Sequence, residues 1–205
     1  CLLPDGCTDM TACNFDPAAL CDDGSCNVLP APFIQGVSGD EFACIGGDAI
    51  SIFGGNFCSS STVTVNGVPA IDLIISQFQI DFTSPPGSGP VTIEIVGNNG
   101  TVSAPWTYAS PILISTSLST TCVGGETVTL NGTNLCDVIS VSFGGQNAAI
   151  ISADANTVTC TVPAPLAEGI ADISVTTPSG VSNLLGFTNG VLGCTSPSAC
   201  NYNML

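Results

Sequence analysis

The sequence predicts an all-β fold in which two tandem β-sandwiches are flanked by small disulfide-rich segments. Residues 44–85 return 78 positions later as residues 122–163, and a Cys-rich motif that begins at Gly6 returns 187 positions later at Gly193. Within the longer repeat, apolar and polar residues alternate with the period of two that half-buried strands show. Similarity at a fixed period is typical of repeat arrays, so the chain reads as one full repeat and the start of the next.

The charge of the chain excludes several classes of function. The 205 residues contain no Lys, Arg or His but sixteen Asp and Glu, which gives a net charge of −16. Without a cation the chain cannot neutralise nucleic-acid phosphates or adsorb to anionic lipid, so we expect no nucleic-acid partner and no membrane insertion. Without His it also lacks the commonest general base. The acidic surface either keeps neighbouring chains soluble or relies on divalent cations for close packing.

The cysteine content predicts the cellular compartment. Twelve Cys residues indicate an oxidising environment, because cytosolic thiols are kept reduced, so we expect an extracellular location, secreted or at the cell surface. No apolar run reaches the roughly 18 to 20 residues that span a bilayer. No export signal is visible either, as expected for an interior piece of a longer polypeptide.

Four segments follow from these patterns. Residues 1–29 form a Cys- and Asp-rich module that is too small to bury a core, so cross-links or a bound ion must hold it. After a stiff linker at residues 29–32, residues 30–109 form the first sandwich and residues 110–190 the second. Residues 191–205 begin the next Cys-rich module.

The strands and turns of the first sandwich can be placed from the same alternation. We expect strands at residues 49–53, 62–65 and 91–95. Asn66-Gly67 and Asn98-Asn99-Gly100 are expected to form hairpin turns with positive φ. The second sandwich repeats these features, with a later shift of two residues that aligns Gly180 with Gly100.

One motif connects both sandwiches to a known family. Gly54-Gly55-Asn56-Phe57 follows the first core strand and returns as Gly132-Thr133-Asn134-Leu135. With the apolar frame around it, the motif resembles the IPT/TIG immunoglobulin-like domain over about 160 residues. The resemblance implies two immunoglobulin-like sandwiches. Nucleic-acid-binding members of this family bind through cationic loops, which this chain lacks. The resemblance is therefore to the extracellular members, and it implies domains that are stacked as spacers and adhesive units.

The Cys-rich motif carries a second resemblance. The run from Gly6 to Asp16 is similar to a short repeat of giant secreted or surface proteins of marine gliding bacteria, often exported by the type IX route. This resemblance implies a segment of a surface protein and brings no activity with it.

Equal cysteine spacing predicts one disulfide in each sandwich. Cys44 and Cys58 are fourteen residues apart, as are Cys122 and Cys136, so we expect the pairs Cys44–Cys58 and Cys122–Cys136. Closing such a loop contributes about 3 kcal/mol in the chain-entropy model. A metal site is the alternative, although it lacks His and the usual clustering.

The remaining cysteines leave several pairings open. Four of them in the first module, Cys7, Cys13, Cys21 and Cys26, allow three pairings. If Cys194 and Cys200 pair with each other, the local solution is Cys7–Cys13 with Cys21–Cys26; alternatively Cys194 and Cys200 bond to partners beyond Leu205. Cys1 has no counterpart in the second copy and is assigned to a preceding repeat. Cys160 replaces Phe82 and is expected to be a buried inert thiol, or else to bond to Cys1 or to a neighbouring chain.

The acidic side chains of the first module suggest calcium as a candidate cofactor. Calcium binds six to eight oxygen ligands, and the module supplies several oxygen-bearing side chains. The candidate ligands are Asp9, Asn14, Asp16, Asp22 and Asp23. Their spacing does not match an EF-hand loop, and Asp and Asn equally serve as turn and capping residues.

Together these observations predict a structural function and no enzyme. No Ser or Cys has a His to activate it, and the carboxylates are not paired. We expect a rigid, protease-resistant repeat of a surface fibre or appendage. It would associate with its own copies or neighbouring repeats and adhere to cells or prey. The alternative is a calcium-dependent glycan- or ligand-binding module of an adhesin, which would need an exposed aromatic platform; Trp106, Tyr108 and Tyr202 are the candidates beside nine Phe.

Overall fold

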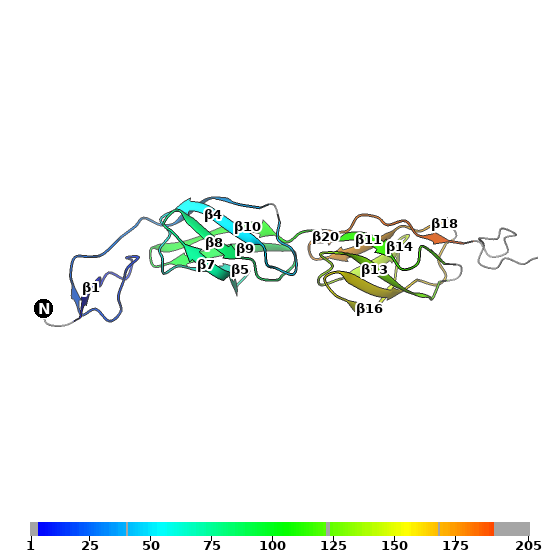
Figure 1. The fold of residues 1–205 in the computed structure, drawn as a ribbon, viewed down its shortest axis with the longest axis horizontal. Helices are drawn as coiled ribbons and strands as arrows, with labels where there is room; N and C mark the ends of the chain where they lie inside the picture. Colours follow the sequence, from blue (N-terminus) through cyan, green and yellow to red (C-terminus); the bar gives the residue numbers. More distant parts are fainter. Residues whose placement is uncertain (1–3, 40, 122–123, 168, 191–205) are drawn as a thin grey trace, which may run out of the picture. The chain divides into compact units, whose positions relative to one another are not determined.

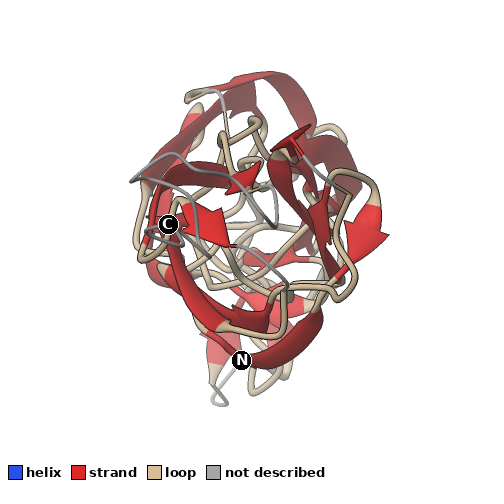
Figure 2. Ribbon diagram, turned by 90° about the vertical axis from the view of Figure 1, so that its right-hand side faces the viewer, coloured by secondary structure: helices blue, strands red, loops and turns tan. Residues whose placement is uncertain are grey.

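The computed structural model describes residues 4–39, 41–121, 124–167 and 169–190 (Figure 1). These residues form strands, turns and loops, and no helix occurs among them (Figure 2). Two compact units are present: Cys1–Pro86 with Pro90–Thr107, and Gly87–Gly89 with Tyr108–Leu205. The predicted all-β, immunoglobulin-like fold class is confirmed.

The first unit contains a two-stranded parallel ribbon and two four-stranded antiparallel sheets. The sheets have the orders β3-β4-β8-β7 and β10-β9-β5-β6. The strands are β1 (Asp5–Gly6), β2 (Cys21–Asp22), β3 (Phe33–Val37), β4 (Ala49–Gly55), β5 (Thr62–Val65), β6 (Val68–Pro69), β7 (Ile71–Ile75), β8 (Gln79–Thr83), β9 (Pro90–Gly97) and β10 (Gly100–Thr107). The three strands expected from alternation lie within β4, β5 and β9.

Alternation along the strands builds the core of this sandwich. Ile50 and Ile52 of β4 are buried, and so are Val63 and Val65 of β5, while the residues between them are more exposed. β9 repeats the pattern with Ile93 and Ile95. Successive side chains of a strand point to opposite faces, so these residues line the inner faces of the two sheets.

The second unit repeats this architecture. Its two antiparallel sheets have the orders β11-β13-β17-β16 and β15-β14-β19-β20, and β12, β21 and β18 form a small third sheet. The strands are β11 (Ile112–Thr116), β12 (Thr120–Thr121), β13 (Thr127–Thr133), β14 (Ser140–Phe143), β15 (Gln146–Asn147), β16 (Ala149–Ala153), β17 (Thr157–Thr161), β18 (Gly169–Ile170), β19 (Ile173–Thr177), β20 (Gly180–Val181) and β21 (Thr188–Asn189). The core includes Val128, Leu130, Val141 and Phe143, which occupy the positions of Ile50, Ile52, Val63 and Val65.

The structure explains why the Gly-x-Asn-Phe/Leu motif occurs in both sandwiches. A Cβ atom on Gly54 would overlap the carbonyl oxygen of Phe33, and one on Gly132 would overlap that of Ile112. The Asn two residues later has a positive φ in both copies, 61° at Asn56 and 55° at Asn134, which Asn tolerates better than most residues. The last residue of the motif, Phe57 or Leu135, is then buried in the core.

Both predicted hairpins are present, with one difference in backbone geometry. Asn66 and Gly67 have φ values of 50° and 82° and join β5 to β6, as expected. In the β9–β10 hairpin Gly97 pairs with Gly100, and of its three turn residues the positive φ falls on Gly100. The side chains of Asn98 and Asn99 contact the Cys-rich module and the linker. In the described part of the chain there is no helix of the length and apolarity that crossing a bilayer requires.

Candidate functional site

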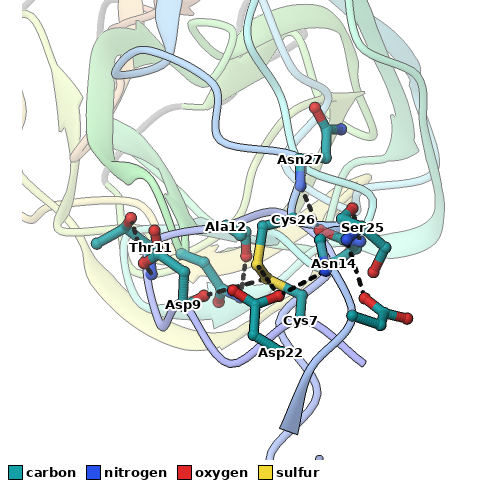
Figure 3. The surroundings of a disulfide bond; sticks show 12 residues. Cys7, Asp9, Thr11, Ala12, Asn14, Asp22, Ser25, Cys26 and Asn27 are labelled. Carbon is teal, nitrogen blue, oxygen red and sulfur yellow. Dashed lines mark hydrogen bonds between the residues drawn. A yellow bond between two sulfur atoms is a disulfide. The ribbon is translucent and has the colours of Figure 1, made fainter. Parts of the chain in front are cut away.

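The Cys-rich module is held by a disulfide in place of a large apolar core. Cys7 bonds to Cys26 across a separation of 19 residues, with a Cα–Cα distance of 4.7 Å (Figure 3). Cys7 and Ala12 are buried, and an isolated parallel bridge pairs Cys7, the residue after β1, with Phe15. A segment this short buries too little surface to be stable alone, so the covalent bond takes the place of a core.

The acidic side chains of the module hold its turns. One carboxylate oxygen of Asp9 accepts hydrogen bonds from the backbone N–H and the hydroxyl of Thr11, at 2.8 and 2.7 Å (Figure 3). These bonds favour the ionised form, so the pKa of Asp9 lies below its ordinary value. The carboxylates of Asp16, Asp22 and Asp23 each accept from the backbone N–H two residues further on.

Asn14 joins the two halves of the module. Its amide nitrogen donates to the carbonyl of Ser25 at 2.8 Å, and its amide oxygen accepts from the N–H of Asn27 at 2.7 Å (Figure 3). Among the described residues no three Asp, Glu or Cys side chains gather closely enough to hold a metal ion. In this structure the five candidate calcium ligands make the turn and bridging hydrogen bonds described above, and calcium binding by them stays a prediction.

A second disulfide fastens the module to the first sandwich. Cys13 bonds to Cys58, 45 residues away, with a Cα–Cα distance of 4.9 Å. The expected pairs Cys44–Cys58, Cys7–Cys13 and Cys21–Cys26 are therefore wrong, because Cys58, Cys7, Cys13 and Cys26 have other partners. The spacing of fourteen residues between Cys44 and Cys58 therefore does not mark a bond between these two residues.

The other described cysteines are disulfide-bonded, with the exception of Cys160. The bonded ones are Cys21, Cys44 and Cys136. Cys1, Cys122, Cys194 and Cys200 lie outside the described residues, so the pair Cys122–Cys136 stays a prediction. Cys160 is a free thiol with no exposed surface, which confirms that it is buried and unbonded. Burial raises its pKa to about 11, which favours the unreactive thiol form.

Two asparagines surround the second disulfide with hydrogen bonds. The amide nitrogen of Asn98 donates to the carbonyl of Ala12 at 3.0 Å. That of Asn99 donates to the carbonyls of Pro30 and Asn56, both at 2.8 Å. Asn98 and Asn99 form the β9–β10 turn, so a single turn of the sandwich contacts the module, the linker and the loop that contains Cys58.

Further contacts complete the junction between module and sandwich. Ser60 donates to the carbonyl of Cys13 at 3.4 Å, and Asn56 donates to that of Ala31 at 3.2 Å. A cleft of about 200 Å³ lies here and is lined from both sides. Its lining includes Cys13, Asn14, Asn27, Phe57, Cys58 and Gln77. We refer to the Cys13–Cys58 bond and these surrounding contacts as the stapled junction.

The sequence pattern predicted only a turn at Asn98 and Asn99, without a functional role. Asn99-Gly100-Thr101 also matches a glycosylation triplet. One signal was available: the two asparagines are absent from the second sandwich, where the two-residue shift places Pro178 and Ser179 at their positions. A pair of polar residues specific to one copy indicates a role outside the shared fold.

The aromatic residues divide into two groups. Tyr108 is buried, and the Trp106 ring packs against Phe42 with centroids 5.7 Å apart, as expected for core packing. Tyr202 lies outside the described residues. Three phenylalanines of the first unit, Phe33, Phe53 and Phe78, are 51, 44 and 64% exposed, a feature that the sequence pattern did not predict.

Comparison with known proteins supports the family resemblance for the second sandwich. Residues 111–189 match the IPT/TIG domain model. Human fibrocystin-L is 29% identical over 156 residues, covering 71% of this chain and 4% of its own length, so the chain spans only a small part of this relative. A surface glycan-binding protein from Prevotella bryantii has a similar fold, with a TM-score of 0.53 and 18% identity over 78% of this chain and 42% of its own. The plexin A4 extracellular region matches with a TM-score of 0.38 and 19% identity over 77% of this chain and 18% of its own.

Proposed function

We propose that this chain is a structural segment of a larger extracellular surface protein. In it, a Cys-rich module and immunoglobulin-like sandwiches serve as a protease-resistant spacer. The observation that carries the proposal is the Cys13–Cys58 disulfide, which joins the module to the first sandwich by a second covalent link besides the peptide chain. The function is mechanical and involves no catalysis.

The disulfide supplies what such a spacer needs. Constraining the unfolded chain over a separation of 45 residues contributes about 4 kcal/mol in the chain-entropy model. A cut in the linker at residues 29–32 would also leave the module attached to the sandwich through the Cys13–Cys58 bond. The segment thus tolerates proteolysis in this linker, and the absence of Lys and Arg removes every trypsin site.

Composition and likeness support an extracellular place for the segment. Disulfides persist in oxidising environments, and fibrocystin-L and the bacterial surface glycan-binding protein share sequence or fold with this chain. The similarity of the Cys-rich motif to repeats of giant bacterial surface proteins fits the same proposal. The proposal includes two more specific roles, which are self-association with neighbouring repeats and adhesion to cells or prey.

The experiment is to pull the oxidised chain from its two ends in a force spectrometer. The matched variant is Cys13→Ser with Cys58→Ser, which removes the bond and leaves no new thiol. In wild type we expect the module to stay with the first sandwich until that sandwich unfolds, and in the variant to detach at lower force. Equal detachment forces in the two proteins would contradict a mechanical role for the bond.

A second candidate function is glycan binding. The exposed Phe33, Phe53 and Phe78 favour it, since aromatic rings are surfaces on which apolar faces of ligands can pack. The fold is also shared with a protein named as a surface glycan-binding protein. A glycan array, probed with and without calcium, tests this candidate. Hits that Phe33→Ala, Phe53→Ala or Phe78→Ala abolishes would support it, and an array without hits would oppose it.

A further inference from the structure

We infer that the Asn98-Asn99 turn selects Cys58 as the disulfide partner of Cys13. The pair acts as a positioning device for oxidative folding, independently of the function proposed above. Its chemistry is the formation of one long-range disulfide in preference to local disulfides that lie closer along the chain.

Selection is needed because chain statistics oppose the observed bond. Cys7 lies six residues from Cys13, whereas Cys58 lies 45 residues away. Loop-closure probability falls with roughly the three-halves power of the separation, so a flexible chain would favour Cys7 over Cys58 by roughly 20-fold. Some feature of the folded structure must therefore raise the local concentration of Cys58 around Cys13.

The geometry of the turn supplies this feature. Asn98 donates to the carbonyl of Ala12, one residue before Cys13, and Asn99 donates to the carbonyl of Asn56, two residues before Cys58. Two adjacent side chains thus hold the backbone beside each of the two sulfur-bearing residues. Asn99 also holds the linker at Pro30, which limits where the module can move.

The turn is a rigid platform that the sandwich provides. β9 and β10 pair over eight residues, from Gly97–Gly100 to Pro90–Thr107, and this pairing does not involve the module. The turn can therefore form as soon as the sandwich folds, before any bond to Cys13 exists. Asn98 and Asn99 occupy a two-residue turn that these paired strands close on both sides, so their position is fixed more precisely than in a free loop.

The chemical step is thiol–disulfide exchange with a small disulfide oxidant such as oxidised glutathione. One thiolate of the pair attacks the oxidant and releases one glutathione thiol. The second thiolate then attacks the mixed disulfide and releases another. Two protein thiols lose two protons and two electrons, and the oxidant is reduced to two thiols. The asparagines take no part in the covalent step; they determine which second thiolate lies within reach.

The test is oxidative refolding of the full chain in a glutathione buffer, followed by peptic digestion and mass-spectrometric mapping of the disulfides. The variant Asn98→Asp with Asn99→Asp keeps the side-chain size and removes both donating amide groups. Asn66→Asp is the matched control, because it makes the same change at an exposed turn of the same sandwich. Fluorescence of Trp106, the single Trp of the chain, reports on folding of this sandwich.

We expect the ratio of Cys13–Cys58 to locally paired Cys13 to fall about tenfold in the double variant, with Trp106 fluorescence native and the control unchanged. An unchanged ratio in the double variant would overturn the inference. Loss of the Trp106 signal together with the bond would overturn it as well, because the asparagines would then support the sandwich itself rather than the pairing.

Discussion

Cys160 shows how one residue in an apolar core responds to pH. Its counterpart in the first sandwich is the aromatic residue Phe82, and both are buried in the strand that pairs with the first core strand. The thiol packs as a small apolar group, and its burial disfavours the thiolate. The residue is therefore chemically quiet in the folded chain, although it is a free thiol.

The second unit should lose stability at alkaline pH because of this residue. The folded pKa of about 11 lies above the ordinary value of 9.0, so the stabilisation is complete below pH 9 and is lost as pH rises towards 11. In that range the unfolded chain has released a proton that the folded chain still holds. Thermal unfolding between pH 7 and 10.5 should show a decline that Cys160→Ala reduces. An equally steep decline in the variant would assign the effect to other groups.

At the scale of the element, the Gly-x-Asn motif lets two paired strands of one sheet approach each other closely. Gly132 of β13 lies against the carbonyl of Ile112 in β11, and Gly54 has the same relation to Phe33. The motif is thus a packing requirement of each sandwich, and its presence in both copies follows from their shared fold. It needs no ligand to explain it.

Substituting this glycine should destabilise the second sandwich. In Gly132→Ala the added methyl group overlaps backbone, which cannot move as a flexible side chain can, so we expect a loss of about 2 kcal/mol or more in the free energy of unfolding. Gly186→Ala is the matched control in the same unit, because no atom lies within 4 Å of the added group. Denaturant unfolding measures both variants. Equal stability of the two would refute the packing argument.

At the same scale, the stapled junction uses elements of two different kinds. The module supplies a disulfide-held loop with little secondary structure, whereas the sandwich supplies a regular hairpin. The side-chain amides of the hairpin turn donate to backbone carbonyls of the module at Ala12, of the linker at Pro30 and of the sandwich at Asn56. A backbone carbonyl accepts such a bond whatever the residue type. Recognition at the junction is therefore set by the path of the backbone.

At the scale of the whole molecule, all charged side chains are acidic, and several carboxylates accept hydrogen bonds from residues close to them. Asp9, Asp23, Asp81 and Asp154 have a pKa below the ordinary value because their ionised form accepts hydrogen bonds. For Asp9 and Asp154 the largest cause is a backbone N–H, and for Asp23 and Asp81 it is a side-chain hydroxyl. Acid pH therefore removes favourable bonds and at the same time relieves repulsion among the sixteen acidic groups.

Stability should be nearly constant from pH 5 to 8 and fall below about pH 4. A carboxylate with a depressed folded pKa stabilises the fold above its unfolded pKa, and this contribution is lost as pH falls through the folded value. The absence of His removes the usual cause of change near neutrality. Melting temperatures from pH 2.5 to 8 measure the profile, and Asp154→Asn should reduce the acid loss. A melting temperature that rises in acid would mean that charge repulsion dominates.

The fold was predictable because its determinants are local or repeated. Alternation located β4, β5 and β9, and Asn66-Gly67 located a hairpin. The duplicated spacing of residues 44–85 and 122–163 is enough to indicate a second copy of the sandwich. The buried state of Cys160 followed from its place on the apolar face of a strand. Each of these inferences depends on neighbours within a few residues or on an internal comparison.

Only the tertiary structure decided which cysteines pair and what the asparagines do. Spacing favoured local loops, but Cys13 bonds to Cys58 because the folded sandwich brings a distant loop to the module. Asn98 and Asn99 look like ordinary turn residues until their amides are seen to reach Ala12, Pro30 and Asn56. Local sequence determines strands and turns through backbone and side-chain preferences. Contacts across 45 or more residues arise only once the chain has folded, because folding offsets the entropy of closing so long a loop.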